Sequence, residues 1–225
     1  VKLANPDLSV WVVTGDGDGL SIGGNHTIHL LRRNLDLNVM LFNNRIYGLT
    51  KGQYSPTSEV GKVTKSTPMG SLDAPFNPLS LALGAGATFV SRTLDKESKH
   101  MQDIITQSYK HRGTSFIEIY QNCNIFNDGA FSSLTDRDTK SDTVLLLEDG
   151  QPMVFGAEKN KAIRLDGNVP KVFEIGDKLT IDDALVHDKK DYVIASLLAN
   201  MTYNPDFPEP LGVFYAIDMP TYEDL

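Results

Sequence analysis

Short apolar runs alternate with longer amphipathic segments over the first 120 residues of the chain. Four runs rich in β-favouring residues predict strands: 10–13, 39–42, 87–90 and 115–119. Three segments between them carry helix signals: 21–34, 77–85 and 96–111. Strands that alternate with helices indicate an α/β fold with three layers, in which a mostly parallel sheet is covered by helices on both faces.

The pattern changes beyond residue 128. Residues 143–156 resemble a β-hairpin and residues 161–168 add strand and turn signals, so we expect a small β appendage near the C-terminus. Residues 180–201 mix helix and loop, and residues 204–224, with four prolines, predict an extended tail that lies on the domain or on a partner. We therefore divide the chain into an α/β domain over 1–135 and a C-terminal appendage and tail over 136–225.

Composition narrows the class of protein. A chain of 225 residues with 40% hydrophobic residues is long enough for one domain, or for one domain with an appendage. A net charge of −8 argues against a nucleic-acid partner, and no apolar run is long enough to cross a membrane. No signal peptide is visible, so a cytoplasmic location is the default expectation. A single cysteine excludes an internal disulfide framework.

Two polar turns follow the first two predicted strands. Gly15-Asp16-Gly17 ends the first strand and Asn43-Asn44 ends the second, with room for one helix and one strand between them. Because both turns belong to one edge of the sheet, the Asp16 carboxylate, the Asn44 amide oxygen and a main-chain carbonyl just beyond could hold Mg²⁺. Backbone N–H groups of the glycine-rich turn, and of the helix start near Ser21, would face a diphosphate.

A calcium-binding loop and a plain turn fit these residues less well than a magnesium site. An EF-hand loop that starts at Thr14 would need Glu at its last ligand position, where the chain has Asn25. A plain turn is the ordinary interpretation of a Gly-Asp segment, and also of an Asn-Asn pair after a strand. The spacing between the two turns favours a metal site instead.

Three further polar features favour structural roles. His26 and His29 share one helix face, but a metal site would need a third ligand. Neighbours such as His187 and Asp188 seldom face one another on a helix, so an acid–base pair is not expected. Lys51, in the long polar loop 48–78, is either an attractor for an anionic substrate or a solvated surface lysine, and the second is the more common.

The sequence around both turns resembles the β subunit of 2-oxoacid:ferredoxin oxidoreductases, most closely those of the 2-oxoglutarate type. The resemblance is carried by residues 15–26, GDGDGLSIGGNH, and residues 43–58, NNRIYGLTKGQYSPTS. It continues through residues 121–123 and 210–214. It implies the thiamine-diphosphate-binding fold, with thiamine diphosphate and Mg²⁺ as cofactors.

Site roles follow from the resemblance. It implies that Asp16, Asn44 and the Ile46 carbonyl ligate Mg²⁺. It implies cofactor contacts from four further residues: Gly17, Asp18, Gly48 and Leu49. The Thr50 hydroxyl would donate a hydrogen bond to a phosphate. The Leu49 backbone would also approach the reacting end of the substrate. No catalytic base is assigned, because in this family the carboxylate that activates the cofactor belongs to the α subunit.

The resemblance also implies an iron–sulfur role for Cys123. A cysteine at the matching position is one ligand of a [4Fe-4S] cluster, which needs four thiolates. The other three are missing here, Val1 stands where an initiator Met would be, and a core strand begins within the first ten or so residues. We therefore expect a chain that lacks the N-terminal segment of its family.

The activity implied by the resemblance is the oxidative decarboxylation of a 2-oxoacid, most closely 2-oxoglutarate. Coenzyme A would accept the acyl group, electrons would pass through Fe–S clusters to ferredoxin, and the α subunit would be the partner. Thiamine diphosphate would carry out the carbanion chemistry, while the protein orients it. Two alternatives stay open at this point: another thiamine-diphosphate decarboxylase or synthase, which would not need Cys123, and a non-catalytic structural remnant.

Overall fold

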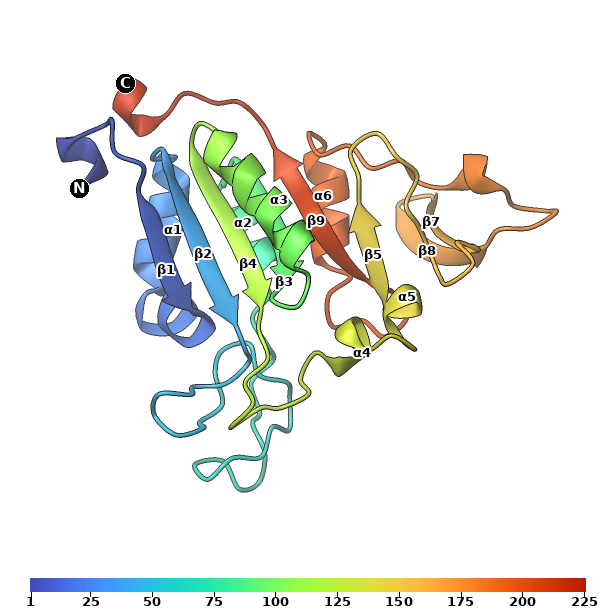
Figure 1. Cartoon of the computed structure of the whole chain (residues 1–225), viewed down its shortest axis with the longest axis horizontal. Helices are drawn as coiled ribbons and strands as arrows, with labels where there is room; N and C mark the ends of the chain where they lie inside the picture. The colour runs from blue at the N-terminus through green and yellow to red at the C-terminus, as the bar shows by residue number, and fades with distance from the viewer.

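Two β-sheets organise the computed structural model, which describes residues 1–225 (Figure 1). The larger sheet has six strands in the spatial order β1-β2-β4-β3-β9-β5. Its strands are β1 (Trp11–Gly15), β2 (Leu37–Asn43), β3 (Phe89–Leu94), β4 (Thr114–Tyr120), β5 (Val144–Leu147) and β9 (Glu209–Ala216). The first four are parallel, β9 is antiparallel to β3, and β5 is parallel to β9. The predicted mostly parallel sheet is confirmed.

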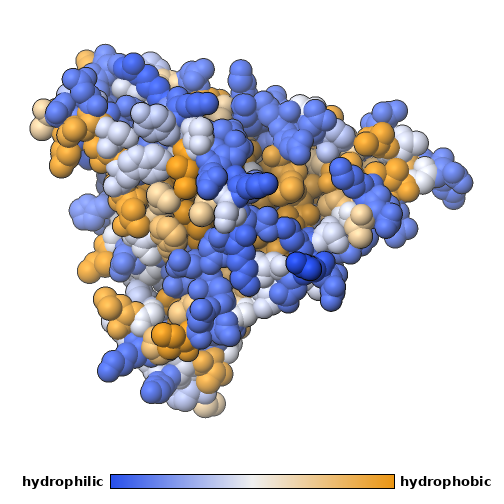
Figure 2. Space-filling view, in the orientation of Figure 1, coloured by the Kyte–Doolittle hydropathy of each residue, from blue (hydrophilic) through white to orange (hydrophobic).

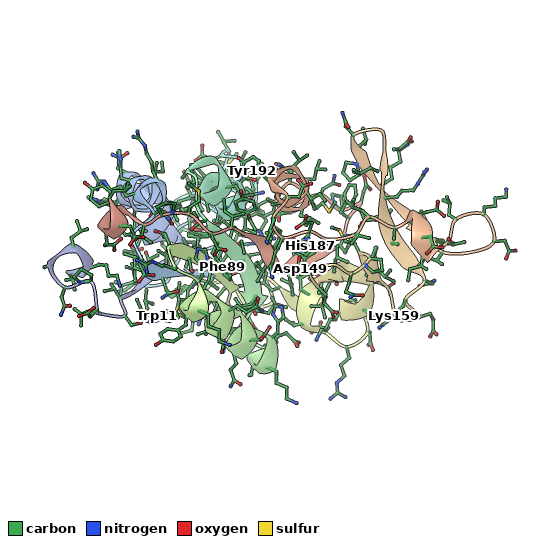
Figure 3. The ribbon with its side chains drawn as sticks, turned by 90° about the horizontal axis from the view of Figure 1, so that it is seen from above. Trp11, Phe89, Asp149, Lys159, His187 and Tyr192 are labelled. Atoms are coloured by element: carbon green, nitrogen blue, oxygen red, sulfur yellow. The ribbon has the colours of Figure 1, made fainter.

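Helices cover both faces of this sheet, as Figure 3 shows from above. On one face lie α1 (Gly24–Arg33), α2 (Pro78–Gly84) and α6 (Tyr192–Ala199), whose buried residues join the main apolar core of 20 residues. On the other face lies α3 (Ser98–Lys110), where Ile104 packs with Phe89 and Ile117. The three-layer prediction is therefore confirmed. No helix has both the length and the apolar character needed to cross a membrane.

Short elements complete the chain. They include a π-helix (Asp18–Ile22), two short helices at the lower edge of the sheet in Figure 1, α4 (Ser132–Thr135) and α5 (Lys140–Thr143), and three 3₁₀ turns (Lys2–Ala4, Ile181–Asp183 and Tyr222–Asp224). Local signals explain several boundaries. The Asn77 side chain accepts a hydrogen bond from the Ser80 N–H and caps α2, while α1 ends at Asn34, whose φ of 49° lies in the left-handed region.

The second sheet is the small β appendage predicted for the C-terminal part. It consists of β6 (Val154–Phe155), β7 (Lys161–Asp166) and β8 (Val169–Glu174), all antiparallel. The hairpin predicted over 143–156 is wrong, however. Its first half is β5, which pairs with β9 in the main sheet, because Val144 and Leu145 are buried in the apolar core there.

The extended tail predicted over 204–224 is also wrong in its first half. Residues Glu209–Ala216 form β9 inside the main sheet, between β3 and β5. Prolines misled the prediction: Pro205 and Pro208 precede the strand, and Pro210 is its second residue, where it pairs with Leu145. Strands from both sides of residue 135 thus share one sheet.

The segment after β9 crosses the amino ends of the parallel strands (Figure 1). There the Asn34 Nδ2 atom donates to the Pro220 carbonyl at 3.0 Å, and the Asp36 N–H donates to the Glu223 carboxylate at 3.1 Å. The Asn34 Oδ1 atom accepts from the Thr88 hydroxyl at 2.8 Å and from the Thr114 N–H at 2.9 Å. This end of the sheet is closed by hydrogen bonds within the chain.

Candidate cofactor site

Both polar turns lie at the carboxyl end of the parallel strands. Asp16 follows β1 and Asn44 follows β2, and the two strands pair in parallel with Gly15 opposite Phe42. Figure 1 shows the loops of this end gathered below the strand arrowheads. The predicted placement of Asp16 and Asn44 at one edge of the sheet is confirmed.

Asp16 is a buried carboxylate, 2% exposed, that is held by hydroxyl groups. Ser55 Oγ donates to its Oδ2 atom at 2.5 Å and Thr57 Oγ1 donates at 2.6 Å. Burial raises the pKa of Asp16, and the hydrogen bonds from Ser55, Thr57 and the Asn44 backbone oppose that rise only in part.

No basic side chain compensates this carboxylate. Asp16 takes part in none of the salt bridges of the chain. A buried ionised carboxylate without a cation is costly, and a bound divalent cation would offset that cost. The surroundings of Asp16 therefore fit a Mg²⁺ ligand.

The turn 44–46 presents further oxygens to the same edge. Asn44 Oδ1 accepts from the Ile46 N–H at 3.3 Å, and the Asn44 carbonyl accepts from Asn127 Nδ2 at 2.9 Å. Ser58 Oγ donates to the Arg45 carbonyl at 2.6 Å. The Ile46 carbonyl oxygen, in contrast, accepts no hydrogen bond within the chain, and so it is free to act as a main-chain ligand.

The Arg45 side chain fixes this turn from the other side. Its backbone φ of 56° lies in the left-handed region, which is uncommon for a long side chain. The guanidinium carbon lies 4.6 Å from the Phe131 ring centroid and 5.0 Å from that of Tyr203, and Nη1 is 2.8 Å from the Glu59 carboxylate. This anchoring holds the backbone of Asn44 and Ile46 in one conformation.

Gly17 is a glycine for a reason other than ligand approach. A Cβ atom at this position would lie 2.1 Å from the Tyr47 ring, and the Tyr47 hydroxyl donates to the Gly17 carbonyl at 3.1 Å. The close packing of Tyr47 therefore excludes any side chain at position 17. Gly48, in contrast, has open space around its Cα.

The remaining predicted cofactor residues lie on the open side of the site. Asp18 and Thr50 are exposed and Leu49 is 99% exposed. Lys51 is also exposed, with a left-handed φ of 75°. A cavity of about 470 Å³ is lined by Tyr47, which bonds the Gly17 carbonyl, and by Ser55, which bonds Asp16, among others. A second cavity of about 410 Å³ lies between β5 and the small sheet, away from both polar turns.

Cys123 lies in the loop after β4, next to the turn 44–46. The residue is half-buried, and its carbonyl accepts from the Asn127 N–H at 3.0 Å. Because the Asn127 side chain also bonds the Asn44 carbonyl, the Cys123 loop is tied directly to the predicted magnesium turn.

His26, His29 and His187 do not form a metal or acid–base site. His26 and His29 are exposed on α1, and the chain contains no group of three or more His, Cys, Asp or Glu residues that could hold a metal. His187 is buried with Nε2 2.8 Å from the Val213 carbonyl oxygen, whereas Asp188 is exposed. Figure 3 places His187 beside β9, within the fold.

Sequence reasoning missed the groups that support Asp16. Ser55 and Thr57 come from the long polar loop, about 40 residues further along the chain. It also missed the buried ion pair of Arg92 and Glu118, in which Nε lies 2.7 Å from the carboxylate and both side chains are 0% exposed. Arg92 lies beyond the predicted strand 87–90, and the single charged residue of the run 115–119, Glu118, was the one available signal.

Comparisons with known proteins show the family of the chain. The model of the family "Thiamine pyrophosphate enzyme, C-terminal TPP binding domain" matches residues 1–119. The chain is 52% identical over 226 residues to 2-oxoglutarate oxidoreductase subunit KorB of Mycobacterium tuberculosis, covering 100% of this chain and 60% of that protein. It is 38% identical to the 2-oxoacid:ferredoxin oxidoreductase subunit beta of a Sulfolobus species, covering 91% of this chain and 68% of that protein.

A solved structure shares the fold as well. It is the 2-oxoglutarate:ferredoxin oxidoreductase from Magnetococcus marinus with 2-oxoglutarate, coenzyme A and succinyl-CoA bound. The TM-score is 0.74 with 31% sequence identity, and the match covers 99% of this chain and 62% of that one. The chain therefore spans about three fifths of the length of its M. tuberculosis relative and of this structural neighbour.

Proposed function

The chain belongs to the family of 2-oxoacid:ferredoxin oxidoreductase β subunits, and we propose that it holds the thiamine diphosphate of such an enzyme as one subunit of a heteromer. The proposed reaction is the oxidative decarboxylation of 2-oxoglutarate, with coenzyme A as acyl acceptor and ferredoxin as electron acceptor. The observation that carries the proposal is the buried Asp16 carboxylate, which has no cation partner and lies beside the Asn44 turn.

The substrate assignment rests on the relatives. The M. tuberculosis relative is named for 2-oxoglutarate, and the M. marinus structure contains 2-oxoglutarate together with succinyl-CoA. The succinyl group has one carbon fewer than 2-oxoglutarate, as loss of CO₂ requires. These names support 2-oxoglutarate as the substrate of the enzyme to which this chain would belong.

Mg²⁺ is proposed to bind Asp16, Asn44 and the Ile46 carbonyl, with diphosphate oxygens and water as the other ligands. Three features support this set: the burial of Asp16, the unbonded Ile46 carbonyl and the anchoring of the turn by Arg45. When bound, thiamine diphosphate supplies the carbanion chemistry. The residues of this chain hold the diphosphate in place and fix its orientation.

Diphosphate and substrate contacts are assigned to four residues on the open side of the site and to Gly17, which is buried under Tyr47. Gly17, Asp18, Gly48, Leu49 and the Thr50 hydroxyl are proposed to contact the cofactor, and the Leu49 backbone to approach the substrate. The exposure of Leu49, Thr50 and Asp18 supports this assignment, because these groups are accessible to a ligand. The cavity beside Tyr47 and Ser55 offers space at the same edge.

An α subunit is proposed to cover this edge. Four apolar side chains of the surrounding loops are almost entirely exposed: Leu49 (99%), Met69 (94%), Leu72 (91%) and Ile125 (81%). Figure 2 shows apolar residues on the surface at this lower end of the molecule. An exposed apolar group of this kind is typical of a protein–protein contact.

Cys123 is proposed as one thiolate ligand of a [4Fe-4S] cluster, with the remaining thiolates supplied from outside this chain. Its loop is bonded to the turn 44–46 through Asn127, and this link supports the proposal of a cluster ligand near the cofactor. This arrangement suits electron transfer from the cofactor to ferredoxin.

The test is a binding and turnover experiment on the complete heteromer. We expect Mg²⁺ and thiamine diphosphate to give binding heat in calorimetry, and 2-oxoglutarate to reduce ferredoxin only when coenzyme A is present. Absence of binding heat would favour a structural remnant. Decarboxylation without ferredoxin reduction would favour a thiamine diphosphate decarboxylase or synthase.

A further inference from the structure

A line of buried polar side chains runs from the cofactor site into the centre of the sheet. Thr57 Oγ1, which donates to Asp16, is 2.9 Å from Asn43 Oδ1. Asn43 Nδ2 donates to Glu118 Oε1 at 2.7 Å, and Arg92 Nε donates to Glu118 Oε2 at 2.7 Å. Asn43, Glu118 and Arg92 are all 0% exposed.

Asn43 connects this line of side chains to the two halves of the candidate site, which are Asp16 and the turn 44–46. Its Oδ1 atom accepts from the Arg45 N–H at 3.1 Å and lies 2.9 Å from Thr57 Oγ1, whose single hydrogen is shared between Asn43 and Asp16. That N–H belongs to the turn 44–46, which presents Asn44 and the Ile46 carbonyl. One amide oxygen therefore fixes Asp16 through Thr57 and the neighbouring turn through Arg45.

The orientation of the Asn43 amide is set by Glu118. An ionised carboxylate only accepts hydrogen bonds, so the NH₂ group of Asn43 must face Glu118 and its oxygen must face Thr57 and Arg45. Arg92 Nε in turn donates to the other Glu118 oxygen at 2.7 Å, a charge-assisted hydrogen bond that holds the carboxylate in place. If Asn43 rotated by half a turn, its NH₂ group would face the Arg45 N–H and that hydrogen bond would be lost.

We propose that Glu118, held by Arg92, is a positioning residue that orients the Asn43 amide and thereby sets the geometry of both halves of the cofactor site. This inference rests on the proposed function, since it assigns Glu118 a role in holding the Mg²⁺ and thiamine diphosphate. Glu118 itself does not contact either group. It acts on them through Asn43, much as outer carboxylates orient the direct ligands of other metal sites.

The test compares two isosteric variants of the same ion pair in the complete heteromer. Glu118→Gln leaves Arg92 facing an amide and removes the acceptor-only partner of Asn43. Glu209→Gln also removes one carboxylate from Arg92, but Glu209 contacts Thr202 and the Tyr120 hydroxyl and does not contact Asn43. Both variants lose one buried or half-buried negative charge, so the control separates orientation of Asn43 from loss of charge.

The readout is Mn²⁺ binding in the presence of thiamine diphosphate, measured from the free-ion and bound-ion electron paramagnetic resonance signals. We expect Glu118→Gln to weaken Mn²⁺ binding by roughly 10–100-fold and to change the bound-ion spectrum. Glu209→Gln is expected to keep the spectrum of the unmodified enzyme. In a chain that already carries Thr57→Val, Glu118→Gln should weaken Mn²⁺ binding by a smaller factor than it does in the unmodified chain. The reason is that Thr57 is one of the two groups through which Asn43 acts.

Three outcomes would overturn the inference. They are an equal loss of Mn²⁺ affinity in both Gln variants, fully additive losses of affinity in Glu118→Gln and Thr57→Val, and unchanged Mn²⁺ binding in Glu118→Gln. Should Glu118→Gln fail to fold, Asn43→Ala keeps the Arg92–Glu118 pair and must show the same loss of Mn²⁺ affinity. Unchanged affinity in Asn43→Ala would then refute the inference. Failure of the unmodified heteromer to bind Mn²⁺ with thiamine diphosphate is a different result, because it would refute the proposed function itself.

Discussion

The two ends of the parallel strands are built differently. At the amino end, the side chain of Asn34 bonds Thr88, Thr114 and the Pro220 carbonyl, and the C-terminal segment covers the strands. At the carboxyl end, Asp16 is buried without a cation and the Ile46 carbonyl accepts no hydrogen bond. Apolar side chains such as Leu49 are exposed there.

This difference indicates that the amino end of the strands contributes to stability and the carboxyl end to ligand binding. Polar groups that find all their partners within the chain stabilise the fold and leave nothing for a ligand. Polar groups that lack partners cost stability until a ligand supplies them. We therefore expect substitutions at the amino end to lower the free energy of unfolding, and substitutions at the carboxyl end to abolish binding.

The largest effect is expected for Asp16→Asn in the heteromer. This change removes the only acidic group of the proposed magnesium site, so metal-dependent retention of thiamine diphosphate should fall by more than the roughly 10–100-fold typical for an outer partner. The thermal midpoint without cofactor should stay the same or rise, because a buried carboxylate is removed. Calorimetry and a thermal shift measure the two quantities.

Asp36→Asn is the matched control for that change. Asp36 is an acidic residue at the amino end, where its carboxylate pairs with Lys2 at 2.8 Å and accepts from the Gly113 N–H at 3.3 Å. It should lower stability and leave cofactor retention intact. Loss of retention in this variant would contradict the separation between the two ends.

The second largest effect is expected for Asn34→Ala, at the amino end. The change leaves the buried Thr114 N–H without a partner, leaves Thr88 with His111 alone, and puts Ala at a φ of 49°. Each unsatisfied buried group costs about 1–3 kcal/mol, so the free energy of unfolding should fall by about 2–4 kcal/mol. Urea denaturation measures it, and Asn34→Gly, which tolerates this φ, should lose less.

A smaller effect is expected when the pH is lowered, because buried histidines then reduce the free energy of unfolding. Burial lowers the pKa of His111, whose Nε2 lies 2.8 Å from the Thr88 hydroxyl, although Asp218 and Asp36 oppose the change. Because the folded state disfavours the charged form, stability is complete above the unfolded pKa of about 6.5 and declines as the pH falls toward the lower folded value. The pKa values of His100 and His187 are also lowered by burial.

Urea denaturation at pH 7.5 and pH 5.5 measures this decline, and His111→Gln should reduce it. A decline of the same size in His111→Gln would assign it to His100 and His187 instead.

The smallest effect is expected for Arg112→Ala. Arg112 pairs with Asp224 on the surface of the amino end, and its side chain is 70% exposed. Exposed ion pairs contribute little to stability, so the denaturation midpoint should not change measurably. A clear loss of stability would show that the C-terminal segment is attached mainly by charge, and not by the hydrogen bonds of Asn34.

Much of the sheet could be predicted because its signals are local. The strand Thr114–Tyr120 and the cap at Asn77 follow from neighbouring residues alone. The predictions for β5 and β9 failed because their pairing is decided by residues far apart in sequence, and prolines near β9 resembled those of a tail.

The candidate site shows the same limit. Asp16 and Asn44 could be paired from the spacing of two motifs, because strand ends meet at one edge of a parallel sheet. The partners of Asp16 in the long loop depend on how the chain returns to that edge, and the pairing of Arg92 with Glu118 depends on the register of β3 and β4. No local pattern encodes such a return. The cofactor roles of Gly17, Asp18, Gly48, Leu49, Thr50 and Cys123 stay predictions.

The position of β9 has a consequence for how the protein is made. Residues 209–216 insert between β3 and β5, so both of those strands keep an open edge on the ribosome until residues 209–216 have been synthesised. Arg92 also lacks its ion-pair partner Glu209 until then, because Glu209 lies 117 residues further along the chain. The nascent chain thus carries unpaired strand edges until β9 emerges, and such edges are prone to aggregation before the sheet is complete.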